Sequence, residues 1–180
     1  MSHELSTALS KSRVIFDRAA IESAIRRMAG EIRADYSGER PVYLTIMHGG
    51  MLFAAQLALE LGIDLEFDYL HATRYRGETR GTDLVWLHRP VTPLAGRKVL
   101  LADDILDEGH TLKAVRDWCV TEGASEVKIA VMTRKLHDRC AEGIRADYIG
   151  LDLPDYYVYG FGMDYHEQGR NLPAIYAYEG

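Results

Sequence analysis

Hydrophobic residues along the chain follow two alternating patterns, one helical and one extended. Between residues 17 and 36, apolar positions recur at three- and four-residue spacing with charged residues between them. This pattern predicts an amphipathic helix with Asp17 as its N-cap. The same reasoning predicts helices at residues 51–62 and 110–122, closed by Gly62 and Gly123.

Short apolar runs separate these helices and predict strands. The runs lie at residues 42–47, 65–70, 84–87, 98–102, 127–132 and 148–151. Because strands and helices alternate, we expect an α/β fold in which helices flank a mostly parallel, twisted sheet. Sheets of this kind bind ligands at the carboxyl ends of their strands. Residues 48–50, 103–111 and 134–135 fall at such ends, so we expect them to share a site.

Length and composition favour one globular domain covering residues 1–180. The chain has 180 residues, 47% of them hydrophobic and 27% charged, and it contains no repeat or linker. Its net charge of -6 disfavours a nucleic acid as partner, because a phosphate backbone requires a basic face. A small anionic substrate remains compatible with this charge, since local amides and a few cations can bind it.

The two cysteines, Cys119 and Cys140, lie in no CxxC pair and at no metal-ligand spacing. We expect them to be reduced thiols, which fits a cytoplasmic location. The N-terminal segment lacks a signal-peptide apolar run, and no segment has the length of a membrane span. We therefore expect a cytoplasmic protein that does not associate with membranes.

The segment VLLADDILDEGHTL, residues 99–112, carries the strongest candidate chemistry. An apolar strand leads to Asp103 and Asp104, and then Asp107, Gly109 and Thr111 precede or open a helix. Amides at a helix N-terminus bind anions, and glycine lets the chain approach a phosphate closely. The carboxylates can accept hydrogen bonds from sugar hydroxyls or hold a hard cation. A solvated acidic turn is the simpler interpretation of the Asp-Asp pair alone, but the whole string favours a binding site.

This string resembles the phosphoribosyl pyrophosphate motif of type I phosphoribosyltransferases. Residues 42–175 are most similar to the hypoxanthine-guanine phosphoribosyltransferases, and the similarity includes the tail DYYVYGFGMDYHEQGRNLP. The resemblance implies the type I phosphoribosyltransferase fold, with a small hood built from terminal segments. Residues 71–83 would form a flexible lid loop, and residues 152–180 would contribute to a purine-binding hood.

The resemblance implies roles for the acidic segment. Asp103 and Asp104 would contact the ribose hydroxyls and the associated Mg²⁺, and Asp107 would be the general acid/base near N7 of the purine. The implied phosphoribosyl-binding residues are Asp103, Asp104, Asp107, Glu108, Gly109, His110 and Thr111. Most family members have Thr where this chain has Glu108. Because a carboxylate repels phosphate, we expect the Glu108 side chain to point outward.

The resemblance also implies a pyrophosphate site made of His48, Gly49, Arg74, Tyr75 and Arg170. The family loop at His48 often begins with lysine and often contains a non-proline cis peptide, which would join residues 47 and 48. The segment alone favours an ordinary strand-to-helix glycine turn. Arg74 replaces a family serine in the lid. Either a bidentate contact with pyrophosphate or a disordered polar loop would explain it.

Purine-binding roles fall on Lys135, Tyr157, Val158 and Asp164 by the same resemblance. Lys135 would donate to the 6-oxo group, which disfavours adenine because two donors would then face each other. Tyr157 would stack on the base, Val158 would offer backbone groups, and Asp164 would hold magnesium through water. The implied metal ligands are Asp103, Asp104 and Asp164.

The implied function is purine salvage, by Mg²⁺-dependent transfer of 5-phosphoribose from phosphoribosyl pyrophosphate to N9 of hypoxanthine or guanine. IMP or GMP and pyrophosphate would be the products. The alternatives are a preference for xanthine or another base, or a non-catalytic regulator that senses nucleotides or binds RNA. The retained Asp107, Lys135 and Asp164 argue against a regulator. Members of this family are commonly dimers or tetramers, so we expect a homodimer or homotetramer.

Overall fold

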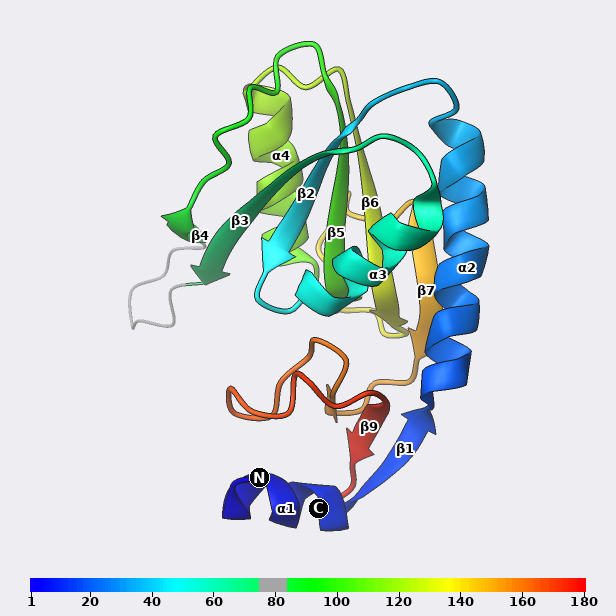
Figure 1. Ribbon diagram of the computed structural model, residues 1–180. Coiled ribbons are helices and arrows are strands. Elements are labelled where there is room, and N and C mark those ends of the chain that lie inside the picture. Colours follow the sequence, from blue (N-terminus) through cyan, green and yellow to red (C-terminus); the bar gives the residue numbers. More distant parts are fainter. Residues whose placement is uncertain (75–83) are drawn as a thin grey trace.

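A six-stranded sheet forms the centre of the molecule, and a computed structural model describes residues 1–74 and 84–180 (Figure 1). The strands lie in the order β4 (Leu84–His88), β3 (Glu66–Arg74), β2 (Val42–Met47), β5 (Lys98–Leu106), β6 (Glu126–Lys135) and β7 (Tyr148–Leu153). Neighbours from β3 to β7 are parallel, and β4 pairs antiparallel with β3 at the edge. The expected mostly parallel sheet is confirmed.

Helices cover both faces of this sheet. Helices α2 (Arg18–Asp35) and α3 (Met51–Leu61) lie on one face and α4 (His110–Thr121) lies on the other, whereas α1 (His3–Ser10) packs in the hood. Successive residues of a strand point to opposite faces. Tyr43 therefore packs in a core with α2 and α3, whereas Val42 and Leu44 pack in a second core with α4. The Asp17 carboxylate accepts a hydrogen bond from the Ala20 amide at 2.8 Å, which confirms the expected cap of α2.

Strand β5 corrects one expectation about the acidic segment. The apolar pattern predicts that the strand ends at residue 102, but β5 continues to Leu106 because it remains paired with β6 as far as Leu106 and Arg134. Asp103 and Asp104 therefore belong to the strand and not to a turn after it. The sheet itself fixes their backbone at the end of the fold where ligands are expected.

A second, smaller sheet builds the hood at the carboxyl ends of the central strands (Figure 1). Its strands lie in the order β1 (Ser12–Phe16), β9 (Ile175–Tyr178) and β8 (Val158–Tyr159). Helix α1 packs Leu5 and Ala8 against Tyr159. The hood is thus built from terminal segments, as expected, although the sequence pattern does not predict α1 or β1 as elements.

Close backbone contact joins the hood to the central sheet. Gly162, with a φ of +104°, lies so near that a Cβ on it would come within 2.2 Å of the Gly49 carbonyl oxygen. In the sheet, the Thr133 hydroxyl donates to the Asp104 carbonyl at 3.0 Å and also lies near the Met163 sulfur of the hood. The hood loop therefore rests directly on the strand ends that carry the acidic pair.

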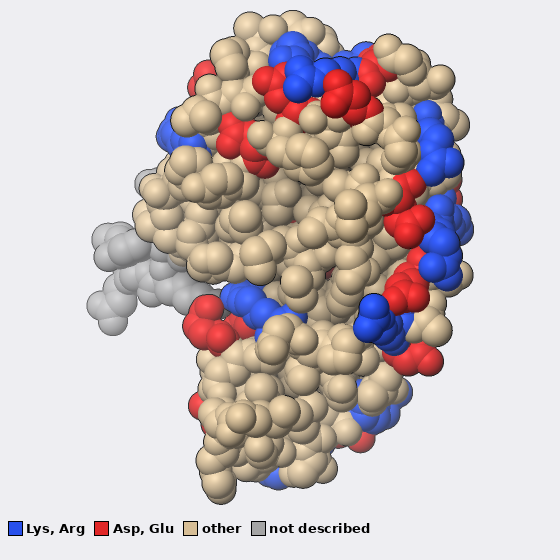
Figure 2. All heavy atoms as spheres, in the orientation of Figure 1, with Lys and Arg blue, Asp and Glu red and all other residues tan. Residues whose placement is uncertain are grey.

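Charged side chains are unevenly distributed over the surface (Figure 2). They gather along α2 and at the end of the molecule away from the hood, whereas the face over α3 is largely uncharged. Exposed apolar side chains lie on α3, at Met51 and Leu59, and on β3, at Phe67 and Tyr69. Within the described ranges, no helix combines the length and the apolar character needed to cross a membrane.

Candidate active site

A pocket of about 690 Å³ lies where the ends of β2, β3 and β5 meet the hood. Side chains from distant parts of the sequence line it, including the turn after β2, the turn before α4 and the hood loop. Of the residues singled out from the sequence, the pocket brings together His48, Gly49, Asp103, Asp104, Asp107, Glu108, Gly109, His110, Thr111, Asp164 and Arg170. The pocket lies at the edge of the sheet where an α/β fold is expected to bind its ligand.

Two adjacent carboxylates lie nearly buried in the pocket wall. Asp103 and Asp104 are only 9% and 8% exposed, and Asp103 Oδ1 accepts a hydrogen bond from the Asp104 amide at 2.9 Å. Burial raises the pKa of both carboxyl groups, and the negative charge of Asp104 raises the pKa of Asp103 further. The pair is therefore costly to ionise unless a cation binds beside it.

The acidic pair fits the magnesium ion that the family resemblance implies. Protein-bound Mg²⁺ prefers oxygen ligands and is commonly held by one or two carboxylates together with substrate phosphates. The loop after β2 approaches this pair closely, because a Cβ at Gly49 would lie 2.1 Å from Asp104 Oδ2. Glycine at this position thus lets the loop backbone and the Asp104 carboxylate share one small space.

Asp164 is already engaged by other groups of the hood loop. Its Oδ1 pairs with the Arg170 guanidinium at 2.8 Å, and its Oδ2 accepts a hydrogen bond from the Glu167 amide at 2.9 Å. Arg170 also donates to the Gly162 carbonyl at 2.9 Å. These contacts aim Arg170 into the pocket and fix Asp164 beside it. A magnesium contact of Asp164 through water stays a prediction.

The turn before α4 presents an anion-binding geometry. Gly109, with a φ of +75°, is the N-cap of α4, whose first residues His110 and Thr111 line the pocket. The free amides and the helix dipole at such an end favour an anion. The Glu108 side chain is 44% exposed and lies 3.7 Å from His110 Nε2, while its backbone carbonyl accepts a hydrogen bond from the Ala141 amide. Glu108 also lines the pocket, so outward orientation stays a prediction.

Two histidines face each other across the ends of β2 and β3. The ring centroids of His48 and His71 are 4.3 Å apart. Burial lowers the pKa of His71, and the positive charges of His48 and Arg170 lower it further. The peptide bond Met47–His48 is cis, as the family resemblance implied, and the ordinary glycine turn favoured by the segment alone is therefore wrong.

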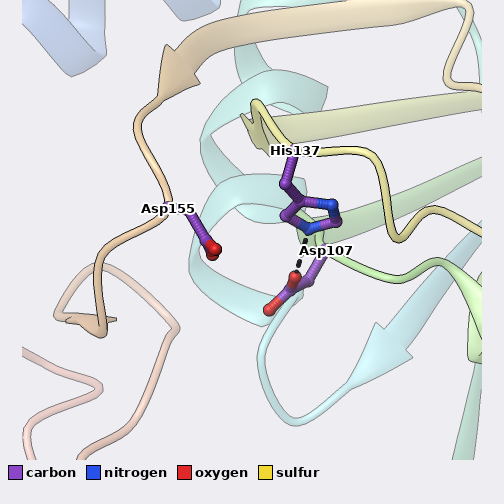
Figure 3. Close-up of side chains that lie close together, drawn as sticks. All are labelled: Asp107, His137 and Asp155. Atoms are coloured by element: carbon purple, nitrogen blue, oxygen red, sulfur yellow. Dashed lines mark hydrogen bonds and ion pairs between the residues drawn. The ribbon is translucent and has the colours of Figure 1, made fainter.

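Asp107, in the turn after β5, is held by two side chains from the end of β6 and the loop after it. Lys135 Nζ lies 2.7 Å from Asp107 Oδ2. His137 Nε2 lies 2.7 Å from Asp107 Oδ1, and Figure 3 shows this second contact. Burial favours the neutral acid, but the hydrogen bonds from Lys135 and His137 outweigh it and keep the pKa of Asp107 below its ordinary value. The carboxylate is thus ionised at neutral pH and can accept a proton.

A second cavity, of about 490 Å³, shares Asp107 with the first and is lined by Lys135 and His137. Lys135 therefore lines the second cavity and not the first, and it contacts Asp107, which lines both. Tyr157 is 48% exposed, and Val158 is buried at the start of β8. Neither residue is among those that line the two cavities described above, so their contacts with a purine stay predictions.

Two predicted residues fall outside what can be described. Arg74 is the last residue of β3, but its side chain lies outside the described part of the chain, as does the whole of Tyr75. Residues 75–83, which contain most of the predicted lid, are likewise outside the described residues. The roles given to Arg74 and Tyr75 stay predictions.

The pocket also contains residues that the sequence analysis did not single out. His71 and Thr73 line it because β3 continues to Arg74, beyond the predicted strand end at residue 70. Had the end of this strand been predicted correctly, both residues would have been expected in the site, because ligands bind at the carboxyl ends of the strands. His137 contacts Asp107 and follows Lys135 by two positions, the spacing of side chains on one face of an extended chain. This spacing was the available signal.

Comparisons with known proteins agree with this geometry. Residues 13–166 match the family described as phosphoribosyl transferase domain. A Streptococcus pneumoniae protein named hypoxanthine-guanine phosphoribosyltransferase is 34% identical over 91% of this chain and 91% of its own. A Streptococcus agalactiae protein of the same name is 32% identical over 91% of each chain. The crystal structure of a Staphylococcus aureus hypoxanthine phosphoribosyltransferase superposes with a TM-score of 0.89 at 26% identity, covering 99% of this chain and 96% of that one.

Proposed function

The chain belongs to the phosphoribosyl transferase domain family, and we propose that it transfers 5-phosphoribose from phosphoribosyl pyrophosphate to N9 of hypoxanthine or guanine. The products are IMP or GMP and pyrophosphate. The observation that carries the choice of base is the contact of Lys135 with Asp107, 2.7 Å apart, at the edge of a pocket that also contains the buried acidic pair. The phosphoribosyl group, the pyrophosphate group and the base can each be assigned to a part of this site.

The phosphoribosyl group fits the pocket wall formed by β5 and α4. The N-terminus of α4 offers amides to the 5-phosphate, since Gly109 to Thr111 line the pocket there. Asp103 and Asp104 precede this turn and offer carboxylate oxygens to the ribose hydroxyls. Magnesium, when bound at this pair, supplies positive charge that neutralises the pyrophosphate oxygens.

The pyrophosphate group fits the pocket wall formed by the loop after β2 and the hood. Arg170 reaches the pocket from the hood, and His48 and His71 line the pocket at the ends of β2 and β3. A guanidinium binds phosphate oxygens through two parallel hydrogen bonds, and backbone amides at Gly49 add further donors. We also propose that Arg74, Tyr75 and the lid close over this end, which would exclude water from the reacting carbon.

The base fits the hydrogen-bond donor of Lys135 and the neighbouring acceptor of Asp107. A 6-oxopurine with a proton on N7 presents an acceptor, O6, next to a donor, N7–H. Lys135 donates and Asp107 accepts, so the two edges are complementary. Adenine presents an amino donor in place of O6, and a donor facing the ammonium leaves both groups without acceptors.

The reaction follows from these placements. As the bond from ribose C1 to the pyrophosphate oxygen breaks, the bond's electron pair leaves with pyrophosphate and positive charge develops on the ribose ring. Arg170 and the loop amides stabilise the departing anion. N9 of the base gives its electron pair to C1, and Asp107 takes the proton from N7.

A purine panel tests the proposal. The purified protein is incubated with phosphoribosyl pyrophosphate, Mg²⁺ and hypoxanthine, guanine, xanthine or adenine, and pyrophosphate release is measured. We expect turnover with hypoxanthine and guanine, and a kcat/KM for adenine at least about 100-fold lower. A preference for xanthine would support the proposed transferase activity but would show that xanthine, and not hypoxanthine or guanine, is the preferred base. Absence of pyrophosphate release with every purine would favour the nucleotide-sensing or RNA-binding regulator.

We further propose that the protein is a cytoplasmic homodimer or homotetramer. Both cysteines, Cys119 and Cys140, are free thiols, as expected in a reducing compartment. Support for self-association comes from the uncharged face over α3, where Leu59 is 86% exposed and Phe67 on the neighbouring strand is 65% exposed. An apolar face of this kind is typical of a protein interface.

A further inference from the structure

His137 is the group outside the proposed substrate contacts that touches the candidate acid/base directly. Its side chain is only 4% exposed, and its Nε2 lies 2.7 Å from Asp107 Oδ1 (Figure 3). The other carboxylate oxygen, Oδ2, contacts Lys135. The two donors thus bind different oxygens of Asp107.

A backbone contact settles the tautomer of this imidazole. The Arg139 amide donates a hydrogen bond to His137 Nδ1 at 3.1 Å, so Nδ1 carries a lone pair and no proton. The ring proton of this neutral imidazole is therefore on Nε2, where it can only be donated to Asp107. The same backbone contact fixes the orientation of the ring.

The two carboxylate oxygens of Asp107 are expected to have different partners when a base binds. If the proposed function is correct, Lys135 turns to O6 and Asp107 Oδ2 faces the N7 proton. His137 cannot follow, because its ring is buried and held by Arg139. It then remains as the donor that holds Oδ1 while Oδ2 receives the proton.

We propose that His137 is a positioning residue for the transfer reaction, which orients Asp107 through its Nε2–H and so directs the free oxygen toward the base. This inference rests on the proposed function. It adds to the site a residue that acts on the base through Asp107. A hydrogen bond to the ionised form also keeps Asp107 in the state that accepts a proton.

A metal site is the other interpretation of this cluster, since Asp107, His137 and Asp155 place their ligand atoms within 4.8 Å of one another. The neighbouring cations argue against it. Lys135 Nζ lies 2.7 Å from Asp107 and 4.0 Å from Asp155, and Arg139 pairs with Asp155 at 2.8 Å. Both carboxylates are thus already balanced by positive side chains, and a metal ion would meet their repulsion.

Two substitutions separate positioning from mere packing. His137→Ala removes the donor, whereas His137→Gln can place an amide N–H near the position of Nε2. We expect His137→Ala to lower kcat by about 10- to 100-fold, while KM for phosphoribosyl pyrophosphate changes by less than about twofold. We expect His137→Gln to recover most of the loss. His3→Gln, an exposed histidine of α1, serves as the matched control with unchanged kcat.

The pH profile provides the readout that packing alone would not change. Among the described residues, the charged or titratable groups near Asp107 include Lys135, His137, Arg139 and Asp155, and Glu108 lines the same pocket. Loss of the His137 donor raises the pKa of Asp107, so the acid limb of the kcat profile should move to higher pH in His137→Ala and return in His137→Gln. Equal kcat values and superposed acid limbs for wild type and both variants would overturn the proposal.

The proposed reaction and the proposed role of His137 are tested by different measurements. Absence of turnover by the wild-type protein in the purine panel would remove the proposed reaction. The side-chain contact has its own measurement in ¹⁵N NMR of the imidazole, where we expect the Nε2–H tautomer at neutral pH. A ring protonated on Nδ1 would contradict the geometry even in an active enzyme. Thermal unfolding of each variant, together with retained binding of phosphoribosyl pyrophosphate, confirms that the comparison is made on folded protein.

Discussion

At the scale of single residues, Asp107 combines an ordinary side chain with an unusual set of partners. Its proton affinity is reduced by Lys135 and His137 and increased by burial. The balance keeps the carboxylate ionised before the base arrives. Proton transfer then becomes favourable because Lys135 leaves for the base, which removes one of the two groups that stabilise the negative charge.

Replacing Asp107 by Asn tests this role. An amide keeps the size and polarity of the side chain but cannot take the N7 proton. We expect kcat to fall by about 10² to 10⁴-fold, with KM for the substrates changed far less. Steady-state kinetics with hypoxanthine measures both values. Near-normal turnover in this variant would contradict the assignment of Asp107 as general acid/base.

His71 is expected to make the binding of phosphoribosyl pyrophosphate depend on pH. Burial together with the charges of His48 and Arg170 lowers the pKa of His71, while Glu167 opposes this. A bound pyrophosphate group favours the protonated ring, so binding takes up a proton. The KM for phosphoribosyl pyrophosphate should therefore rise as the pH increases above the lowered pKa of His71, by up to about tenfold per unit for one proton.

The His71→Gln variant should lose this pH dependence, because its amide does not titrate. His88→Gln is the matched control, since His88 stacks on Tyr69 and does not line the pocket. Initial-rate measurements across the pH range give the KM values. A pH dependence retained in full by His71→Gln would exclude His71 as the proton acceptor.

At the scale of secondary-structure elements, the start of α4 depends on one glycine. A Cβ at Gly109 would lie 2.8 Å from Ile144 Cγ2 and 2.9 Å from Leu106 Cδ1, and the φ of +75° adds backbone strain. We expect Gly109→Ala to lower the free energy of unfolding by about 1–3 kcal/mol and to raise the KM for phosphoribosyl pyrophosphate. Denaturant unfolding and initial rates measure these effects.

Gly96→Ala isolates the backbone part of this effect. Gly96 has a similar φ of +72°, but a Cβ there would meet nothing within 4 Å. We expect this control to lose only about 1 kcal/mol of stability and to keep its KM. If the two variants behaved alike, the contacts of Gly109 with Ile144 and Leu106 would have no special importance.

Local sequence patterns predict the elements of the central sheet because their apolar spacing is set by burial on both faces. They fail where distant pairing decides the structure. Asp103 and Asp104 interrupt an apolar run, yet pairing with β6 keeps them in the strand. The hood strands β1 and β9 pair with each other from opposite ends of the chain, and β8 contains only two residues, Val158 and Tyr159. No local pattern contains that pairing.

The candidate site shows the same division. The turn from Asp107 to Thr111 could be predicted because its residues are contiguous and chemically distinctive. The contacts of Asp107 with Lys135 and of Asp164 with Arg170 depend on how separate segments meet. Their residue types were predicted by resemblance, but the ion pairs that they form were not.

At the scale of the whole molecule, self-association is expected to use the face over α3. Leu59→Glu places a charge at a site that is 86% exposed, so a monomer would tolerate it, whereas an apolar interface would not. Val120→Glu is the matched control, at a 58% exposed position on α4 across the sheet. Sedimentation analysis should show a smaller particle for Leu59→Glu alone. An unchanged mass would place any interface elsewhere.

The position of β9 between β1 and β8 has a consequence for how the protein is made. The central sheet is complete once residue 153 has been synthesised, but β1 finds its partner only when residues 175–178 leave the ribosome. A nascent chain of that length therefore contains all six strands of the central sheet, while Ser12–Phe16 still lacks the strand with which it pairs. Since the hood supplies Arg170 and closes the pocket, translation itself delays catalytic competence until the hood strands have been delivered.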